Sequence, residues 1–223
     1  MLSWGSLAKP RNFQEVLDRG YVPGRDLRIA FGDANIGRCL LAAPHGGGIE
    51  PGTSEILRAV AELGGWAWYE FAGFLRKGNK TGLHITSVQF DEPTLLALLL
   101  QTNFVLSFHG ANEPGDQVAY VGGSWVDGRA TIAKMINAAT ATHGIHAEDA
   151  AAHAPGHLHG AEPTSLTNRG KFAQGIQLEF SRTARNLLFP PDCSREARGR
   201  RSSRLDALAQ AIHAGLEQLC QKQ

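Results

Sequence analysis

Short apolar or alternating segments recur along the chain, and between them lie segments in which apolar residues return every third or fourth position. The short segments indicate strands and the others indicate helices. We expect strands at residues 27–31, 38–43, 66–71, 83–88, 104–108, 118–121 and 175–180. We expect helices at residues 12–19, 93–100, 127–142 and 202–219. A further helix should follow Glu50, with a hydroxyl cap near Thr53 and an end at Gly64 and Gly65.

This order of strands and helices predicts a layered α/β domain with a mostly parallel or mixed central sheet. At 223 residues the chain fits one domain, which we assign to residues 1–223. Residues 1–19 would form an N-terminal extension with a short helix, and the helix at 202–219 would pack on the same domain through an apolar stripe. In such sheets, ligands bind beyond the carboxyl ends of the strands.

Composition narrows the class of protein without indicating a function. Hydrophobic residues make up 43% of the chain and charged residues 19%, as in a soluble globular protein, and a net charge of +1 points to neither nucleic acid nor a membrane. Three widely spaced cysteines indicate neither a disulfide framework nor a thiolate zinc site. Because we find no signal peptide and no apolar run of about 18 residues, we expect a cytoplasmic protein. A phage protein released by lysis would look the same.

Two histidines each follow an apolar strand at its carboxyl end. His45 follows the expected strand at 38–43, and His109 follows the one at 104–108. Glu50 comes after His45 across three glycines, which permit a tight backbone path. Two imidazoles and one carboxylate form a donor set for a catalytic zinc ion, which keeps one position open for water. Alternatively, the glycines form an anion-binding loop that His45 only caps, but this interpretation does not account for His109.

A carboxylate also lies on an otherwise apolar strand near the end of the chain. In the expected strand at 175–180, three apolar residues share one face, and Gln177 and Glu179 share the other. Burying a carboxylate is costly unless it is paired or functional. Glu179 could bind the metal, pair with Arg182, or act as general base on water, and we favour the general base.

A loop at residues 163–174, ahead of that strand, carries Asn168 and Arg169. A guanidinium group beside an amide suits the capture of a substrate carboxylate, although a loop arginine on its own is usually solvated. Lys171 and Arg182 could assist in the same role. These four side chains are therefore the candidate substrate-binding residues.

Two other clusters of side chains could bind a ligand. The first consists of His143, His146, His153, His157 and His159. It could bind metal, but it spans a helix end and a loop, so that a solvated loop is the better interpretation. The second consists of Arg195, Arg198, Arg200, Arg201 and Arg204. It could bind nucleic acid, but it lacks interleaved aromatic residues, and we interpret it as a solvated segment before the last helix.

Four motifs, taken in order, resemble those of the phage-type poly-γ-glutamate hydrolases, a family of zinc peptidases. They are Pro-His-Gly-Gly-Gly-Ile-Glu at 44–50, Ser-Phe-His-Gly at 107–110, Asn-Arg-Gly at 168–170 and Gln-Leu-Glu-Phe-Ser-Arg at 177–182. The resemblance covers roughly residues 20 to 217. It implies a three-layer α/β/α fold with a mixed central sheet, similar to that of zinc carboxypeptidases.

The resemblance also implies roles for individual residues. One Zn²⁺ per chain would be bound by His45, Glu50 and His109, with Glu179 as the catalytic carboxylate. Asn168 and Arg169 would be the pair that grips a substrate carboxylate. In the wider carboxypeptidase group the first two ligands are spaced His-x-x-Glu, whereas four residues separate them here, and the glycines can absorb the longer loop.

We therefore expect a zinc-dependent hydrolase of γ-glutamyl amide bonds that acts on a carboxylate-rich peptide or polymer. An alternative within enzymes is a zinc deacylase or carboxypeptidase for small N-acyl amino acids or peptide ends. A non-enzyme alternative is a phage-related nucleic-acid accessory protein that uses the arginine run. We expect neither nucleic acid nor a membrane as partner, and we favour a monomer.

Overall fold

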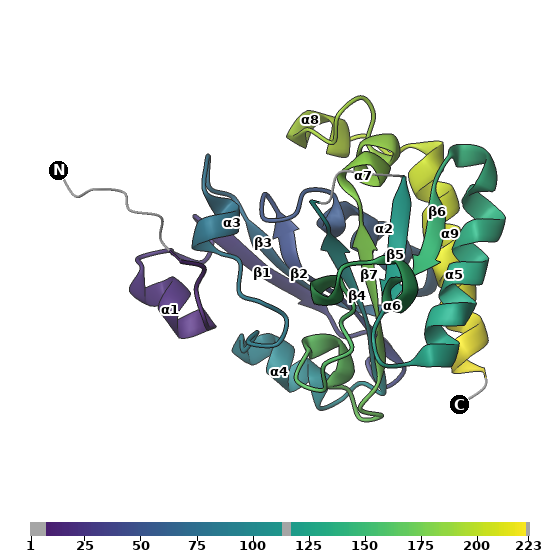
Figure 1. Ribbon diagram of the computed structural model, residues 1–223. Coiled ribbons are helices and arrows are strands. Elements are labelled where there is room, and N and C mark those ends of the chain that lie inside the picture. The colour runs from purple at the N-terminus through teal and green to yellow at the C-terminus, as the bar shows by residue number, and fades with distance from the viewer. Residues whose placement is uncertain (1–7, 113–116, 222–223) are drawn as a thin grey trace.

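Residues 8–112 and 117–221 are described by the computed structural model, in which a seven-stranded sheet lies between two layers of helices and loops (Figure 1). Along the sheet the strand order is β1-β3-β2-β4-β7-β5-β6. The strands are β1 Leu27–Gly32, β2 Cys39–Gly47, β3 Ala67–Gly73, β4 Phe104–Gly110, β5 Val118–Gly122, β6 His146–Asp149 and β7 Gly175–Phe180. The helices are α1 Phe13–Asp18, α2 Thr53–Gly64, α3 Asn79–Gly82, α4 Pro93–Leu99, α5 Val126–Thr140, α6 Ala150–His153, α7 Arg182–Leu188, α8 Arg195–Arg198 and α9 Ser203–Cys220.

The sheet is mixed. Strands β3, β2, β4 and β7 run parallel to one another, while β1 pairs antiparallel with β3, and β5 pairs antiparallel with β7 and parallel with β6. The expected three-layer α/β fold with a mixed sheet is therefore confirmed. Since the four central strands are parallel, their carboxyl ends lie at one edge, where β2, β4 and β7 deliver His45, His109 and Glu179.

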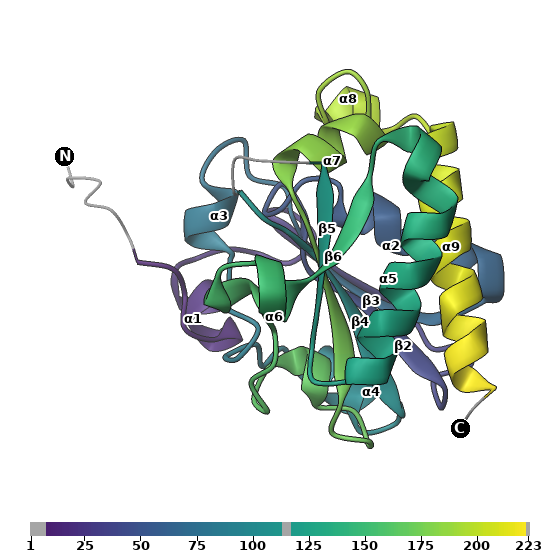
Figure 2. The ribbon, with the colours of Figure 1, turned by 45° about the vertical axis from the view of Figure 1, so that its right-hand side comes forward.

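Alternation along the strands sends side chains into two separate cores. Leu41 and Leu178 belong to the core on one face, under α2, α5 and α9, and Figure 2 shows α5 and α9 side by side over this face. Leu40 and Val105 belong to the core on the opposite face, where α1 and α4 pack. The apolar stripe expected in the last helix is buried in the first core. None of the described helices is long and apolar enough to span a membrane.

Most expected elements are present, with ends shifted by a few residues, but two expectations are wrong. Residues 83–88 form no strand, because Leu83 and Ile85 pack into the second core while the segment pairs with no neighbouring strand. Helix α2 has Gly52 as its N-cap without a side-chain cap, and the Thr53 hydroxyl instead donates to the carbonyl of Glu50 over 2.9 Å. The sequence pattern also does not predict β6, α3, α6, α7 and α8, which are short.

Strand β2 contains an irregularity just before the candidate site. Ala43 pairs with Glu70 of β3 and Gly46 pairs with Ala72, so that three steps along β2 match two along β3. The extra residue is a β-bulge, a device that re-aims side chains next to functional sites. His45 lies within the bulge, and its imidazole faces His109.

Candidate active site

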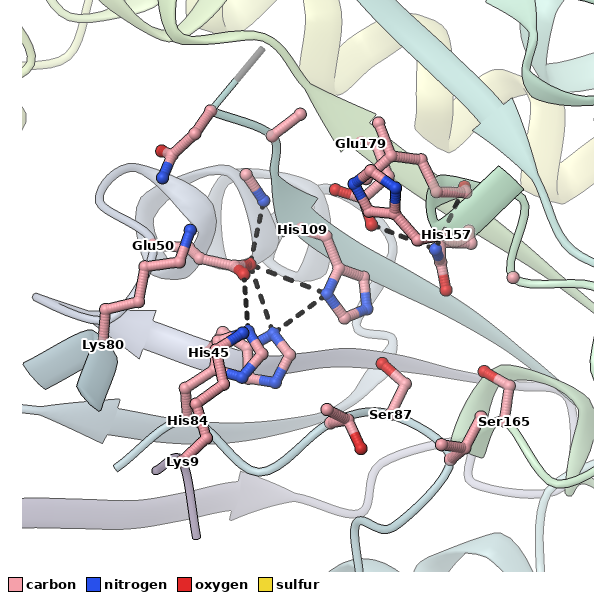
Figure 3. Close-up of a pocket in the computed structure, with 18 of the residues that line it drawn as sticks. Lys9, His45, Glu50, Lys80, His84, Ser87, His109, His157, Ser165 and Glu179 are labelled. Carbon is pink, nitrogen blue, oxygen red and sulfur yellow. Dashed lines mark hydrogen bonds and ion pairs between the residues drawn. The ribbon is translucent and has the colours of Figure 1, made fainter. Parts of the chain in front are cut away.

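Three donor atoms converge at the carboxyl edge of the sheet (Figure 3). Nδ1 of His45, at the end of β2, lies 3.1 Å from Nδ1 of His109, at the end of β4. Oε2 of Glu50, in the loop before α2, lies 3.2 Å from the first of these nitrogens and 3.6 Å from the second. All three side chains are buried, and their donor atoms face one another.

The spacing of the three atoms fits a metal ion. In a tetrahedral zinc site with bonds of about 2.1 Å, two ligand atoms are separated by about 3.4 Å, and the three observed separations bracket that distance. Nε2 of His45 lies 2.7 Å from the carbonyl oxygen of Ile85, which it can contact only as a donor. In the neutral tautomer with its proton on Nε2, Nδ1 of His45 is the nitrogen available to bind a metal. Among the described residues, this is the one group of three that could hold an ion.

The loop between His45 and Glu50 requires glycine because it packs closely against its neighbours. At Gly46 a Cβ atom would lie 2.4 Å from the hydroxyl oxygen of Ser54, and at Gly47, whose φ is +65°, it would lie 2.5 Å from a carbonyl oxygen of β3. The backbone N–H of Glu50 donates to the carbonyl of His45 over 2.8 Å and closes a turn. This turn places the carboxylate of Glu50 beside the imidazole of His45. The N-cap of α2 is Gly52, so that His45 does not cap this helix. The geometry therefore favours a metal site over an anion-binding loop.

Glu50 is held in place by groups from two other segments. The backbone N–H of Gly110 donates to its Oε2 over 2.9 Å, and Nε2 of His84 donates to its Oε1 over 3.2 Å. Burial alone would raise the pKa of Glu50, but the adjacent His45 and the hydrogen bonds from the histidines hold this pKa well below its ordinary value. His84 also stacks on His45, with ring centroids 3.9 Å apart, and burial lowers the pKa of His84 to about 4. His84 is therefore neutral near pH 7 and acts as a donor to Glu50.

Glu179 lies on β7, the strand next to β4. It pairs in register with His109, so that the two side chains leave the sheet on the same face. Glu179 is buried, and its Oε1 accepts a hydrogen bond from Gln177 over 3.0 Å. Burial and the nearby charge of Glu50 raise the pKa of Glu179 well above its ordinary value. Glu179, which the sequence predicts as general base, therefore lies on the same face of the sheet as the candidate metal ligand His109.

The donors and Glu179 line a cavity of about 430 Å³. Other side chains along its wall are Lys9, Lys80, Ser87, His157, Glu162 and Ser165. Figure 3 shows Lys9 and Lys80 reaching toward Glu50 from the same side of the cavity. Partial burial, and then repulsion from Lys80, lowers the pKa of Lys9. Neither lysine forms a hydrogen bond or ion pair with the part of the chain that the structure describes, which leaves two cations for an anionic ligand.

Asn168 and Arg169, predicted to grip a substrate carboxylate, do not line this cavity. The amide of Asn168 is used within the fold, because Oδ1 accepts from Ser124 over 2.7 Å and Nδ2 donates to the carbonyls of Gly160 and Glu162 over 2.8 and 2.9 Å. Since Gly160 and Glu162 do line the cavity, Asn168 supports its wall from outside.

The other predicted substrate residues also lie away from the donors. Nη1 of Arg169 donates to the carbonyl of Phe90 over 2.8 Å. Lys171 lies in an exposed turn, and Arg182 is exposed at the first position of α7. Neither of these two residues lines the cavity. The structure therefore brings the metal donors and Glu179 together without bringing these three side chains to them.

Sequence reasoning misses Arg185, which joins three segments at the edge of the sheet. Its guanidinium donates to the carbonyls of Pro51, Ala111 and Phe180 over 2.8, 2.9 and 3.2 Å. Its positive charge partly offsets the burial and the Glu50 charge that raise the pKa of Glu179. Arg182 and Arg185 are three residues apart in one helix, and nothing in their pattern shows which of them is buried.

Sequence reasoning also misses His84, Lys9 and Lys80. His84 lies in the segment wrongly expected to be a strand, and the available signal was a histidine between two apolar residues that prove to be buried. Lys9 comes from the N-terminal segment and Lys80 from α3, both distant in the chain from the motifs. Lysines in such positions are usually solvated, so that no sequence signal distinguishes these two.

The histidines between residues 143 and 159 do not form a metal site with one another within the described ranges. His146 pairs with Glu148 over 3.1 Å, and Nε2 of His159 lies 2.9 Å from the carbonyl oxygen of Ala154. His157 instead lines the cavity beside Glu179. The described residues thus give no second metal site in this segment, and the segment is also more than the expected loop, because His146 begins β6 and His153 ends α6.

Comparisons with known proteins agree with this geometry. A family model described as "Poly-gamma-glutamate hydrolase" matches residues 11–213. The structure of a bacteriophage poly-gamma-glutamate hydrolase is similar, with a TM-score of 0.86 and 29% identity, and the match covers 97% of this chain and 100% of that one. A structure described as zinc-free YNDL has a TM-score of 0.80 and 29% identity, with 93% and 96% covered.

Curated relatives come from Bacillus subtilis (strain 168). The UPF0714 protein YmaC is 32% identical over 192 residues, which are 86% of this chain and 77% of that protein. The SPbeta prophage-derived UPF0714 protein YoqZ is 35% identical over 152 residues, which are 68% of this chain and 52% of that protein. The match thus spans about half the length of the prophage-derived relative. The chain belongs to the poly-gamma-glutamate hydrolase family.

Proposed function

We propose that this member of the poly-gamma-glutamate hydrolase family is a zinc-dependent hydrolase that cleaves γ-glutamyl amide bonds in a carboxylate-rich polymer or peptide. One zinc ion per chain would be held by His45, Glu50 and His109. The observation that carries the proposal is the convergence of these three buried donors on a cavity that Glu179 also lines. The description of the YNDL structure as zinc-free supports zinc as the metal.

Glu179 is the proposed proton carrier. When bound, the zinc ion supplies a Lewis acid for the scissile carbonyl and lowers the pKa of the attacking water. Glu179 accepts a proton from that water and later donates it to the leaving amine. Its position suits this role, because it faces the cavity but is not part of the three-residue donor group. Gly110 and His84 meanwhile fix the carboxylate of Glu50, which keeps that group in place as a ligand.

Lys9 and Lys80 are the proposed contacts for substrate carboxylates. Each γ-linked glutamate keeps its α-carboxylate, so that a substrate of this class carries one negative charge per residue. Ammonium groups in a partly desolvated cavity wall attract such a charge more strongly than ammonium groups in open water. Asn168 would contribute by fixing Gly160 and Glu162 of the cavity wall.

Replacing Glu179 by glutamine tests its role directly. Glu179→Gln should keep one zinc ion per chain and lose hydrolysis of poly-γ-glutamate by about 10²- to 10⁴-fold, the usual contribution of a general acid–base group. Atomic absorption measures the zinc, and the appearance of new amine ends measures the hydrolysis. Glu62→Gln, an equal change at an exposed position on α2, is the matched control and should behave as the wild type. Full hydrolysis by a zinc-loaded Glu179→Gln variant would rule out the role.

The substrate class needs a separate test. Zinc-loaded protein is incubated with poly-γ-glutamate and, in parallel, with a panel of N-acyl amino acids, and the products are sized by chromatography. We expect the polymer to be shortened, with oligomers as products of internal cuts and monomers as products of cuts at chain ends. Cleavage of the small amides alone would identify a deacylase and overturn the proposed substrate.

A further inference from the structure

A second cavity, of about 310 Å³, adjoins the loop that carries the metal donors. Gly47, Gly48 and Pro51 line it, whereas His45 and Glu50 of the same loop line the active-site cavity. Neighbouring residues of one loop thus form walls of two different cavities. The arginines around the second cavity, which we call the arginine cavity, are Arg28, Arg58, Arg76, Arg195 and Arg198.

Two carboxylates only partly balance these arginines. Glu70 is buried and accepts hydrogen bonds from Arg58 over 2.5 Å and from Arg28 over 2.9 Å. Burial alone would raise the pKa of Glu70, but the hydrogen bond from Arg58 and the nearby guanidinium charge hold this pKa below its ordinary value. Glu55 pairs with Arg198 over 3.2 Å. Five guanidinium groups against two carboxylates leave the arginine cavity with a surplus of three positive charges.

Arg76 and Arg195 are the arginines without a carboxylate. Both are exposed, and neither forms a hydrogen bond or ion pair within residues 8–112 and 117–221. Helix α2 begins at this cavity, where Pro51 and Ser54 line the wall, and its N-cap Gly52 supplies no side-chain acceptor. The N–H groups at the start of α2 add to the positive potential. The arginine cavity therefore favours anionic ligands.

The structure divides the basic run that the sequence shows between residues 195 and 204. Arg195 and Arg198 line the arginine cavity, whereas Arg200 and Arg201 pair with carboxylates of α8 and α2. Nucleic acids are bound by basic stripes or patches that follow an extended backbone. Arg204, at the start of α9, lies outside this cavity and forms no ion pair with the part of the chain that the structure describes. The arginines of the run that lie beside the active site are Arg195 and Arg198, and their grouping in one cavity suits separate carboxylates better than a phosphate backbone.

We propose that the arginine cavity binds carboxylates of the same γ-linked glutamate chain that is cleaved at the metal centre, and so holds the polymer at a second point. This proposal rests on the proposed function. Guanidinium groups match carboxylates in bidentate geometry, and the ligand carries one carboxylate per residue. Binding at one point raises the effective concentration of the chain at the other. We expect a γ-linked dimer bound at the metal centre not to extend into the arginine cavity.

The test measures binding while cleavage is blocked. Poly-γ-glutamate with a fluorophore at one end is titrated with zinc-loaded Glu179→Gln protein, and then with the same protein carrying Arg76→Ala and Arg195→Ala. We expect the two added substitutions to weaken polymer binding by about tenfold and to leave binding of a γ-linked glutamate dimer unaltered. The matched control carries Arg11→Ala and Arg200→Ala, which remove two exposed arginines outside both cavities, and should bind the polymer as the parent protein does.

Three results would overturn the proposal. The first is equal polymer affinity in the test and control variants. The second is an equal loss for polymer and dimer, which would place Arg76 and Arg195 at the cleavage point. The third is tighter binding of single-stranded DNA than of the polymer, which would make the cavity part of a nucleic-acid site. Failure of the wild type to cleave the polymer would instead contradict the proposed function, and the binding comparison distinguishes the two failures.

Discussion

The active-site cavity and the arginine cavity adjoin the same glycine loop, yet they hold charge in different ways. In the active-site cavity the carboxylates are buried, with Glu50 7% and Glu179 6% exposed, and their ionisation depends on their neighbours. In the arginine cavity the unpaired groups, Arg76 and Arg195, are exposed. Buried charges interact strongly and at fixed geometry, whereas exposed charges interact weakly and reversibly. This difference is consistent with the bond cleavage proposed for the first cavity and the polymer binding proposed for the second.

Removing a proposed metal donor from the buried active-site cavity should have the largest effect on hydrolysis. His109→Ala should lose bound zinc and reduce hydrolysis by at least about 10⁴-fold, because two donors hold the ion poorly and no water is activated without it. Its melting temperature should also stop responding to added zinc, since ligand binding no longer stabilises the fold. Zinc content and melting curves with and without zinc measure these effects. His143→Ala is the control, and a His109→Ala protein that retains one tightly bound zinc would contradict the donor assignment.

Removing the lysines of the active-site cavity should have an intermediate effect. The Lys9→Ala and Lys80→Ala double variant should raise the KM for the polymer by about tenfold with a smaller change in kcat, because these groups would bind carboxylates in both ground and transition states. Steady-state kinetics measure both constants. Lys77→Ala with Lys134→Ala removes two exposed lysines elsewhere. If both double variants show the same KM, substrate carboxylates are bound by other groups.

The smallest kinetic effect is expected at Arg169. Arg169→Ala should leave KM within about twofold of the wild type and lower the free energy of unfolding by about 1 kcal/mol, because it removes the hydrogen bond to the carbonyl of Phe90. Kinetics and urea denaturation measure the two quantities. A large rise in KM with unaltered stability would show that Arg169 reaches substrate after all, as the order of the motifs suggests.

Side chains that end regular strands could be placed from the sequence. His45, His109 and Glu179 follow or occupy apolar segments, and the carboxyl ends of parallel strands meet at one edge of a sheet. Glu50 could be added because glycines let the chain turn back within a few residues. The bulge in β2 could not be predicted, because it depends on pairing with β3, which lies beyond the next helix.

The sequence gives less guidance for irregular segments than for regular strands. Residues 83–88 alternate like a strand, but they find no strand to pair with, and His84 contacts Glu50 from outside the sheet. Asn168 and Arg169 have the chemistry to grip a carboxylate, but hydrogen bonds to backbone carbonyls occupy Nδ2 of Asn168 and Nη1 of Arg169. Periodicity indicates which face of a helix or strand a residue lies on, but it does not indicate where a side chain in a loop points.

By itself, the sequence determined most of the strands and helices, the candidate metal donors, the candidate general base and the resemblance to a hydrolase family. Only the tertiary structure decided which cations reach which cavity: Lys9 and Lys80 line the active site, Arg185 joins the segments at the sheet edge, and Arg76 and Arg195 line the second cavity. The physical reason is that a donor set at strand ends follows from local pattern and sheet geometry. A cavity wall is instead assembled from segments far apart in the chain, and their positions depend on the packing of the whole fold.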